Sequence, residues 1–198
     1  SWISDLSVEL TSMAIQIYGG MGYVEETGVA QYLRDARIAP IYAGTNGIQA
    51  LDLTLKKIHI DEGKVVNNLF DEMISVSNEL NKSDILSKLT ESYQFHIKNL
   101  MESTEKVRKL MINGNQKSIS GFASPYTKMF GQVLGGYYMA KAAVIADKKY
   151  KETGEEYYKD KITLSKFYIE QLLPLSVTNM PPIDSDVDDL FMINRENF

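Results

Sequence analysis

Two glycine-containing segments are the places where this sequence could bring a ligand against its backbone. Residues 16–23 read Gln-Ile-Tyr-Gly-Gly-Met-Gly-Tyr, and residues 41–49 read Ile-Tyr-Ala-Gly-Thr-Asn-Gly-Ile-Gln. Glycine removes the side chain that would keep a ligand away from the main chain. The second segment also precedes a predicted helix, whose free N–H groups and positive dipole end favour phosphate or another anion. Taken alone, such turns more often serve as helix caps and helix crossings, and their spacing names no cofactor.

The other residues with chemical potential indicate structural roles. His59 and His96 are the only histidines, and neither has a second ligand at metal spacing. The acidic residues between 184 and 189 lack the mid-loop glycine and the closing glutamate of an EF-hand, which predicts a solvated tail. Cysteine is absent, so disulfides, thiolate metal sites and a cysteine nucleophile are excluded. We therefore predict no metal site.

The composition is that of an ordinary globular protein. The 198 residues carry a net charge of −5, with 44% hydrophobic and 24% charged residues. This balance gives no indication of the basic patch that nucleic-acid binding needs, and we expect no nucleic-acid partner. No apolar run approaches the ~20 residues of a membrane-spanning helix, and no signal-peptide pattern is seen. We expect a cytoplasmic protein without a membrane span. A start within a predicted helix, without a methionine, leads us to expect a piece of a larger protein.

The first part of the chain is predicted to form three helices joined by glycine turns. Apolar residues spaced by three and four over residues 6–17 predict an amphipathic helix that ends at Gly19-Gly20. A short helix follows and is expected to stop before Pro40. A third helix is predicted to begin after residues 44–46, with Thr45 or Asn46 as its N-cap, and to run through Leu55.

From about residue 63 the pattern changes to long charged helices. These are predicted over residues 64–80, 86–111, 126–150 and 157–173, with the last helix ending at Pro174 and an irregular acidic tail from residue 180. The fold class is therefore all-α, a helical bundle, with a boundary near residue 60 that separates residues 1–60 from residues 61–198. Residues 1–60 cannot bury their apolar faces alone, so we expect the later helices or another chain to cover them.

Three blocks in order carry a family resemblance. Residues 16–23, the block Arg-Asp-Ala-Arg-Ile at residues 34–38, and residues 42–49 together resemble the C-terminal signature region of acyl-CoA dehydrogenases. The resemblance implies that residues 1–60 are part of the family's C-terminal four-helix bundle and that residues 61–198 are a helical extension. It also implies an oxidoreductase that binds FAD at the subunit interface of a homo-oligomer and acts on an acyl-CoA substrate.

The resemblance assigns roles to individual residues. Gly44 would lie against the acyl-CoA. Arg34 and Asp35 match the family block, and we expect them to brace the bundle by ion pairing. The FAD contacts fall into two groups. One group would contact the adenine-nucleotide part of a cofactor bound mainly by the neighbouring subunit: Gln16, Ile17, Tyr18, Gly19 and Gly20. The other would contact the cofactor of the same subunit: Thr45, Asn46 and Gly47.

Further details point to a branch of the family. Ala30-Gln31 stands before Tyr32 where many relatives have Glu-Arg, and a helical extension of about 140 residues follows residue 60. These features, with residues 124–141 and the closing residues 191–198, resemble the longer subfamily that includes 3-methylmercaptopropionyl-CoA dehydrogenases. Electron-transferring flavoprotein is the family's usual electron acceptor and is the acceptor that the resemblance implies.

One departure from the family pattern decides the chemistry. The family's catalytic glutamate, which removes the α-proton of the thioester, occupies the position that here is Ala43. The backbone N–H at this position could still hold the thioester oxygen, but no base is supplied. Three explanations stay open: an engineered Glu-to-Ala change, a natural loss of activity, or a base supplied by an earlier helix outside this chain.

Two functions follow as alternatives. In the first, the chain is the C-terminal part of an FAD-dependent acyl-CoA dehydrogenase, and it is inactive alone because most of the family's FAD site lies in other domains. In the second, it is a non-enzymatic helical module for oligomerisation or scaffolding that descends from such an enzyme.

Overall fold

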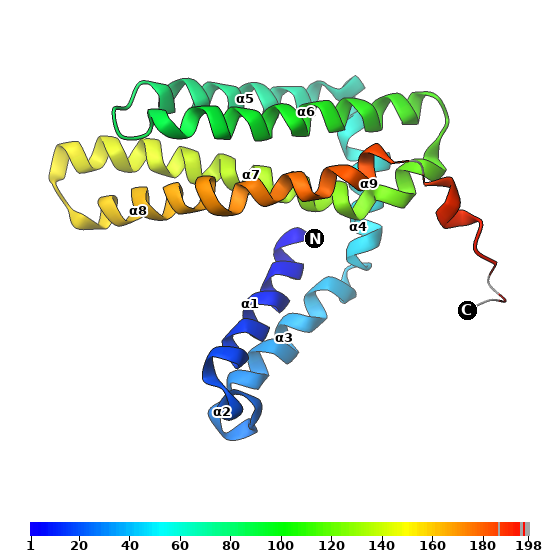
Figure 1. Ribbon diagram of the computed structural model, residues 1–198, viewed down its shortest axis with the longest axis horizontal. Coiled ribbons are helices and arrows are strands. Elements are labelled where there is room, and N and C mark those ends of the chain that lie inside the picture. Colours follow the sequence, from blue (N-terminus) through cyan, green and yellow to red (C-terminus); the bar gives the residue numbers. More distant parts are fainter. Residues whose placement is uncertain (186, 195, 197–198) are drawn as a thin grey trace.

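A computed structural model describes residues 1–185, 187–194 and 196. The predicted all-α fold is confirmed, since these residues form helices and turns and contain no strand. Figure 1 shows two parts: a helical hairpin made by the first helices, and a bundle of long helices from which the hairpin projects at an angle.

The hairpin consists of α1 (Trp2–Tyr18) and α3 (Val29–Tyr42), joined by α2 (Gly20–Tyr23) and the 3₁₀ turn η1 (Glu25–Thr27). The predicted end of the first helix is confirmed, because Gly19 follows α1 with φ of 61°, a backbone conformation that favours glycine. α1 and α3 lie side by side along their length (Figure 1).

α4 (Asn46–Leu55) and η2 (Lys57–Gly63) connect the hairpin to the bundle, and α4 packs against α7 of the bundle. η2 contains Asp61 and Glu62 with φ of 51° and 56°, an unusual conformation for residues with a side chain. The Arg108 guanidinium donates to the Glu62 carbonyl at 2.5 Å and covers Gly63, where a Cβ would lie 2.4 Å from the guanidinium carbon. This contact fixes the corner at which the chain enters the bundle.

Four antiparallel rods form the bundle: α5 (Lys64–Asn81), α6 (Thr90–Ile112), α7 (Gln116–Thr153), and a fourth run of successive helical segments. This fourth run comprises α8 (Glu156–Phe167), the π-helix η4 (Tyr168–Leu172), the 3₁₀ segment η5 (Leu173–Asn179) and α9 (Met180–Asp184). The 3₁₀ turn η3 (Ser87–Leu89) precedes α6, and η6 (Asp188–Phe191) ends the described fold.

The bundle core is the one that the apolar spacing predicts. The residues spaced by three and four before and along α6 are buried from Leu86 to Val107, and they pack against buried residues of the other rods. Fully enclosed members include Leu80, Tyr93, Leu100, Tyr126, Met129, Val133, Ile169 and Leu173.

Three of the predicted helix boundaries that differ from the structure involve a proline. α3 continues through Pro40 to Tyr42, since a proline in the last turn removes only one hydrogen bond. α7 begins at Gln116 rather than near residue 126 and carries Pro125 within it. Pro174 does not end the last helix, because it stands at the start of η5, where a missing N–H costs little.

The acidic tail is also more ordered than predicted. Residues 180–184 form α9 rather than an irregular segment, with prolines in its first turn. Asp184 is exposed and forms an ion pair with Lys106 of α6, at 3.1 Å between Nζ and Oδ1. Of the predicted acidic cluster, Asp186 lies outside the described residues.

Candidate functional site

The turn between α3 and α4 has the cap geometry that its sequence predicts. Gly44 has φ of 72°, so a glycine is needed to reverse the chain after Ala43. Thr45 is the N-cap of α4, and its hydroxyl accepts from the Ile48 N–H at 3.4 Å. Ala43, Gly44, Thr45 and Gly47 are all exposed, so the turn offers its backbone at the surface.

A side-chain hydrogen bond closes this turn. The amide of Gln49 donates to the carbonyl of Ala43 at 2.7 Å, so α4 holds the end of α3. Ala43 caps α3 without donating its own N–H back into the helix, whereas Lys56, which caps α4, donates to the Asp52 carbonyl. The Ala43 carbonyl is thus engaged by a side chain, and its N–H makes no cap bond to α3.

Asn46 ties the same turn to the beginning of α1. Its side-chain amide donates to the Ser1 carbonyl at 3.0 Å, to the Ser4 hydroxyl at 2.9 Å and to Asp5 Oδ1 at 2.7 Å. The Ser4 hydroxyl lies 3.2 Å from Asn46 Oδ1. The start of α4 and the start of α1 are therefore joined through one side chain.

The second predicted segment lies at the far end of the hairpin. Gln16, Ile17, Tyr18, Gly19 and Gly20 are exposed, and a Cβ at Gly19 or Gly20 would meet no atom within 4 Å. The neighbouring Gly22 is different. It is buried, and a Cβ there would lie 2.5 Å from the Ile15 carbonyl oxygen, so this glycine permits a close helix crossing.

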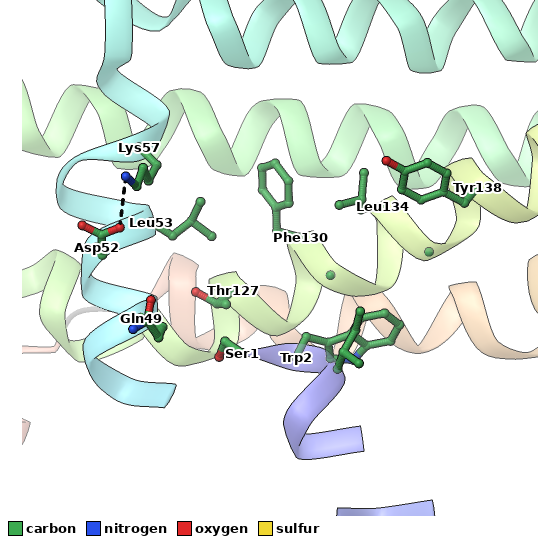
Figure 2. A pocket seen from close by; sticks show the side chains of 13 residues that line it. Ser1, Trp2, Gln49, Asp52, Leu53, Lys57, Thr127, Phe130, Leu134 and Tyr138 are labelled. Carbon is green, nitrogen blue, oxygen red and sulfur yellow. Dashed lines mark ion pairs between the residues drawn. The ribbon is translucent and has the colours of Figure 1, made fainter. Parts of the chain in front are cut away.

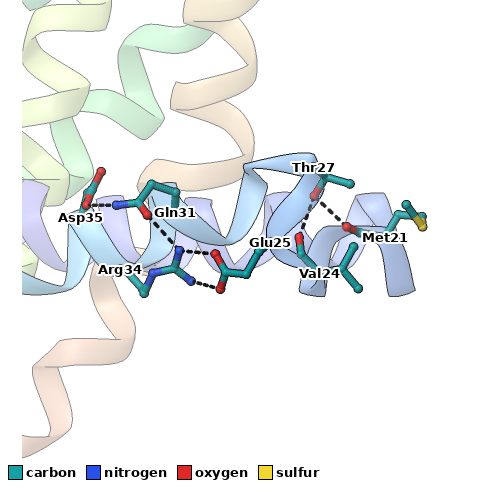
Figure 3. A network of polar contacts seen from close by, with 7 residues as sticks. All are labelled: Met21, Val24, Glu25, Thr27, Gln31, Arg34 and Asp35. Atoms are coloured by element: carbon teal, nitrogen blue, oxygen red, sulfur yellow. Dashed lines mark hydrogen bonds and ion pairs between the residues drawn. The ribbon is translucent and has the colours of Figure 1, made fainter.

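A polar network holds the hairpin tip, as Figure 3 shows. Arg34 makes two parallel bonds to Glu25, at 2.9 and 2.7 Å, and a third to Gln31 Oε1 at 2.8 Å. Asp35 accepts from the Gln31 amide at 2.6 Å. The predicted ion pair of Arg34 is present, but its partner is Glu25 of the hairpin tip. Because the network is exposed, it adds little to the free energy of folding and mainly holds the geometry of the tip.

The two segments are not brought together within this chain. They stand at opposite ends of the hairpin (Figure 1), separated by the 17 residues of α1, or roughly 25 Å at the rise of an α-helix. One ligand of ordinary size cannot touch both segments at once, and a single copy of the chain supplies two separate partial surfaces.

The apolar stripe of α1, formed by Leu10, Met13 and Ile17, is exposed, although an apolar helix face of this kind is normally buried in a protein core. Leu10, Met13 and Ile17 are 54%, 50% and 84% exposed, and α1 has no buried residue. The later helices were expected to cover this face or leave it to another chain, and in the structure they leave it open. Other large apolar side chains on the hairpin are also exposed: Tyr18, Met21, Tyr23, Tyr32, Ile38, Ile41 and Tyr42.

Comparisons with known proteins match both parts of the chain. Residues 68–193 match the family model described as acetyl-CoA dehydrogenase C-terminal like, and residues 1–55 match the acyl-CoA dehydrogenase C-terminal domain. The chain belongs to the acyl-CoA dehydrogenase family.

Curated relatives agree with this assignment. The 3-methylmercaptopropionyl-CoA dehydrogenase of Ruegeria pomeroyi is 31% identical over 86% of this chain, a match that spans the extension and confirms the resemblance to the longer subfamily. A butyryl-CoA dehydrogenase of Syntrophomonas wolfei is 26% identical over 88% of the chain. In both cases the match covers 29% of the relative's own length. The short-chain specific acyl-CoA dehydrogenase of Megasphaera elsdenii is 50% identical over 24% of this chain and 12% of its own.

This acyl-CoA dehydrogenase chain has a pocket of about 460 Å³ that the sequence did not predict (Figure 2). It lies where the start of α1 meets α4 and α7. Its apolar walls include Trp2, Phe130 and Tyr138, and the ion pair of Lys57 and Asp52, at 3.6 Å, lies at its rim. No local signal reveals this pocket, because it joins residues from three distant parts of the chain.

The histidines of this acyl-CoA dehydrogenase chain have structural surroundings. His59 Nε2 lies 2.9 Å from the Thr54 carbonyl, and buried His96 Nδ1 lies 3.0 Å from the Ser176 hydroxyl. Burial lowers the pKa of His96, since the charged imidazolium loses its hydration. In the described part of the chain, no group of three or more His, Cys, Asp or Glu is arranged to hold a metal ion. Over the same residues, no helix is long and apolar enough to cross a membrane.

Proposed function

We propose that this chain is the C-terminal part of an FAD-dependent acyl-CoA dehydrogenase and does not complete that reaction alone. The observation that carries the proposal is the order of the two family matches, residues 1–55 and then 68–193, with the glycine turns of the first match presented at the surface. The division into residues 1–60 and an extension of residues 61–198 is part of the proposal. So are a cytoplasmic location, a homo-oligomer and electron-transferring flavoprotein as acceptor.

The residues assigned to FAD fit the cofactor as two partial surfaces. Thr45, Asn46 and Gly47 begin a ten-residue helix, whose N-terminal N–H groups suit a pyrophosphate. Gly19 and Gly20 leave space around their backbone into which an adenine nucleotide can approach. We assign these two surfaces to two different cofactors in an oligomer, because roughly 25 Å of helix separates them.

The reaction proposed for the whole protein is α,β-dehydrogenation of an acyl-CoA thioester. FAD, when bound, accepts the hydride that leaves the β-carbon. Gly44 lies against the substrate, and the Ala43 N–H holds the thioester oxygen as negative charge develops on it. Hydrogen bonding of the Ala43 carbonyl by Gln49 supports this role, because it fixes the backbone that carries the donor.

Ala43 itself supplies no base for the α-proton. Loss of a positioned base typically costs about 10²–10⁴-fold in rate. An engineered change, a natural loss and a base from an earlier helix remain the three explanations. They differ in outcome. The first two predict a protein that binds acyl-CoA and hardly turns it over, and the third predicts an active protein with alanine in place.

The non-enzymatic alternative has one observation in its favour. The exposed apolar stripe of α1, with Leu10, Met13 and Ile17, is a surface on which a helical module could assemble with a partner. Sequencing the gene upstream separates the alternatives. An in-frame continuation with a middle domain supports the enzyme, whereas a start codon close to Ser1 supports the module.

The Ala43→Glu change tests the proposed chemistry in the protein extended by the residues that its gene encodes before Ser1. With a lost base, the change should raise anaerobic flavin bleaching by acyl-CoA by roughly 10²-fold or more and alter acyl-CoA binding little. With a base on an earlier helix, the alanine form should bleach rapidly, and a second carboxylate in the pocket should raise the pKa of one of the pair and help little. Extended protein that binds neither FAD nor acyl-CoA would refute the proposal.

A further inference from the structure

The start of the hairpin is docked in a glycine groove of α7. Trp2, the chain's only tryptophan, lies against Gly131 and Gly135, which are one helical turn apart on the same face of α7. Figure 2 shows the indole directed toward this helix, beside the pocket. Trp2 is only partly exposed, whereas Leu10, Met13 and Ile17 of the same helix are exposed.

The groove has no room for a side chain. A Cβ at Gly131 would lie 2.6 Å from Trp2 Cγ and 2.7 Å from Trp2 Cβ. A Cβ at Gly135 would lie 3.2 Å from Trp2 Cη2, and it would also overlap the Tyr168 hydroxyl, which donates to the Gln132 carbonyl at 2.9 Å. Because the atoms at Gly131 are the root of the indole and not its flexible tip, a methyl group there must displace the first turn of α1 itself.

The first turn of α1 also holds the turn between α3 and α4, residues 43–45, which is called the site turn below. Ser1, Ser4 and Asp5 are the three acceptors of the Asn46 amide, at 3.0, 2.9 and 2.7 Å. Asn46 is the first residue of α4, and Gln49 of the same helix donates to the Ala43 carbonyl at 2.7 Å. A continuous series of contacts therefore runs from Gly131 of α7, through Trp2 and Asn46, to Ala43.

We propose that the extension positions the site turn, with Trp2 and Gly131 as positioning residues. α7 holds Trp2, Trp2 places the first turn of α1, and this turn fixes the N-terminus of α4 and the backbone of Ala43. The importance of the turn for catalysis rests on the proposed function. The mechanical coupling itself does not, and it can be measured on the 198-residue chain without any activity.

The substitution Gly131→Ala tests the coupling, and Gly136→Ala is its matched control. Both lie in α7 and both gain the same helix propensity. A Cβ at Gly136 faces only the flexible tip of Leu173, at 3.1 Å, away from Trp2. Tryptophan fluorescence reports the docking of Trp2 alone, because the chain has no other tryptophan. Amide hydrogen exchange of Ile48 and Gln49, whose N–H groups bond to Thr45, reports the turn.

We expect Gly131→Ala to red-shift the fluorescence and to speed exchange at Ile48 and Gln49 by about two- to thirtyfold, the usual range for coupled sites. Gly136→Ala should change neither. Trp2→Ala should speed exchange similarly, and in that background Gly131→Ala should add nothing. Fluorescence that shifts without a change in exchange, an equal effect of Gly136→Ala, or additive effects in the double variant would overturn the proposal. If Gly131→Ala does not fold, Trp2→Ala decides alone, and unchanged exchange in it overturns the proposal.

Discussion

Gln49 and Ala43 are joined across the α3–α4 turn by a hydrogen bond of 2.7 Å from the side-chain amide to the backbone carbonyl. The bond ties the first turn of α4 to Ala43, the residue before Gly44, whose φ is 72°. The position to which the family resemblance assigns the catalytic base thus has a fixed backbone even though its side chain is a methyl group.

Replacing Gln49 by Leu should loosen this turn. A hydrogen bond of this kind contributes about 0.5–1 kcal/mol where it is exposed. Exchange of the Ile48 amide, whose N–H bonds to the Thr45 hydroxyl, should therefore rise by roughly two- to fivefold, with little change in global stability. Gln31→Leu is the control, because Gln31 is also an exposed glutamine that bonds only side chains of the hairpin tip. Equal exchange at Ile48 in wild type and Gln49→Leu would show that the bond does not hold the turn.

Asp147 should be the most costly carboxylate to remove from the bundle. It is 4% exposed and accepts from the Ser83 hydroxyl and from Lys151 Nζ, each at 2.8 Å, which links the loop after α5 to α7. Asp147→Ala leaves the buried Ser83 hydroxyl without its acceptor, and we expect a loss of about 1–3 kcal/mol in urea unfolding. The exposed Asp160→Ala should stay within about 0.5 kcal/mol. A loss at Asp147 no larger than at Asp160 would contradict the assignment.

The sequence predicts those features that depend on neighbours along the chain. The apolar seam from Leu86 to Val107, before and along α6, follows from spacing alone. The turns at Gly19 and Gly44 follow from glycine and the Thr45 cap. The helix boundaries predicted at Pro40 and Pro125 were wrong, because packing on neighbouring helices outweighs one lost backbone hydrogen bond.

Long-range contacts could not be predicted from the sequence. Nothing local indicates that Asn46 reaches the first turn of α1, or that Trp2 lies on Gly131, since these pairs are far apart in the chain. The same holds for the exposure of Ile17, because periodicity marks an apolar face without saying whether a partner covers it. The roles of Gln16, Thr45 and the other assigned contacts stay predictions.

His96 should make stability depend on pH in the mildly acidic range. Burial lowers its pKa below that of an unfolded histidine, so the folded state favours the neutral ring. The stability that comes from burying the neutral ring is fully present above about pH 6.5. It is lost as the pH falls from there toward the folded pKa, because the unfolded histidine then binds a proton that the folded one does not. The free energy of unfolding in urea should therefore fall more between about pH 7.5 and 5.5 for the wild type than for His96→Gln. An unchanged pH dependence in His96→Gln would refute this.

The apolar stripe of α1 should cause self-association of the isolated chain. Ile17 is 84% exposed on this stripe, and Ile112, at the end of α6, is 79% exposed away from it. Because burial of an isoleucine contributes about 1.5–3 kcal/mol, Ile17→Lys should weaken association by roughly tenfold or more in sedimentation velocity. Ile112→Lys should have little effect. A wild-type chain that stays monomeric at all concentrations, or equal effects of the two changes, would count against the stripe as an assembly surface.

The most direct measurement of the proposed function is the FAD content of two purified proteins: the 198-residue chain alone, and the same chain extended by the residues that its gene encodes before Ser1. The chain alone carries two partial surfaces at opposite ends of one hairpin, so it should purify colourless and bind FAD no tighter than about millimolar in equilibrium dialysis. The extended protein should retain one FAD per subunit. Stoichiometric flavin in the chain alone, or none in the extended protein, would contradict the assignment of this chain as one part of a flavin-dependent acyl-CoA dehydrogenase.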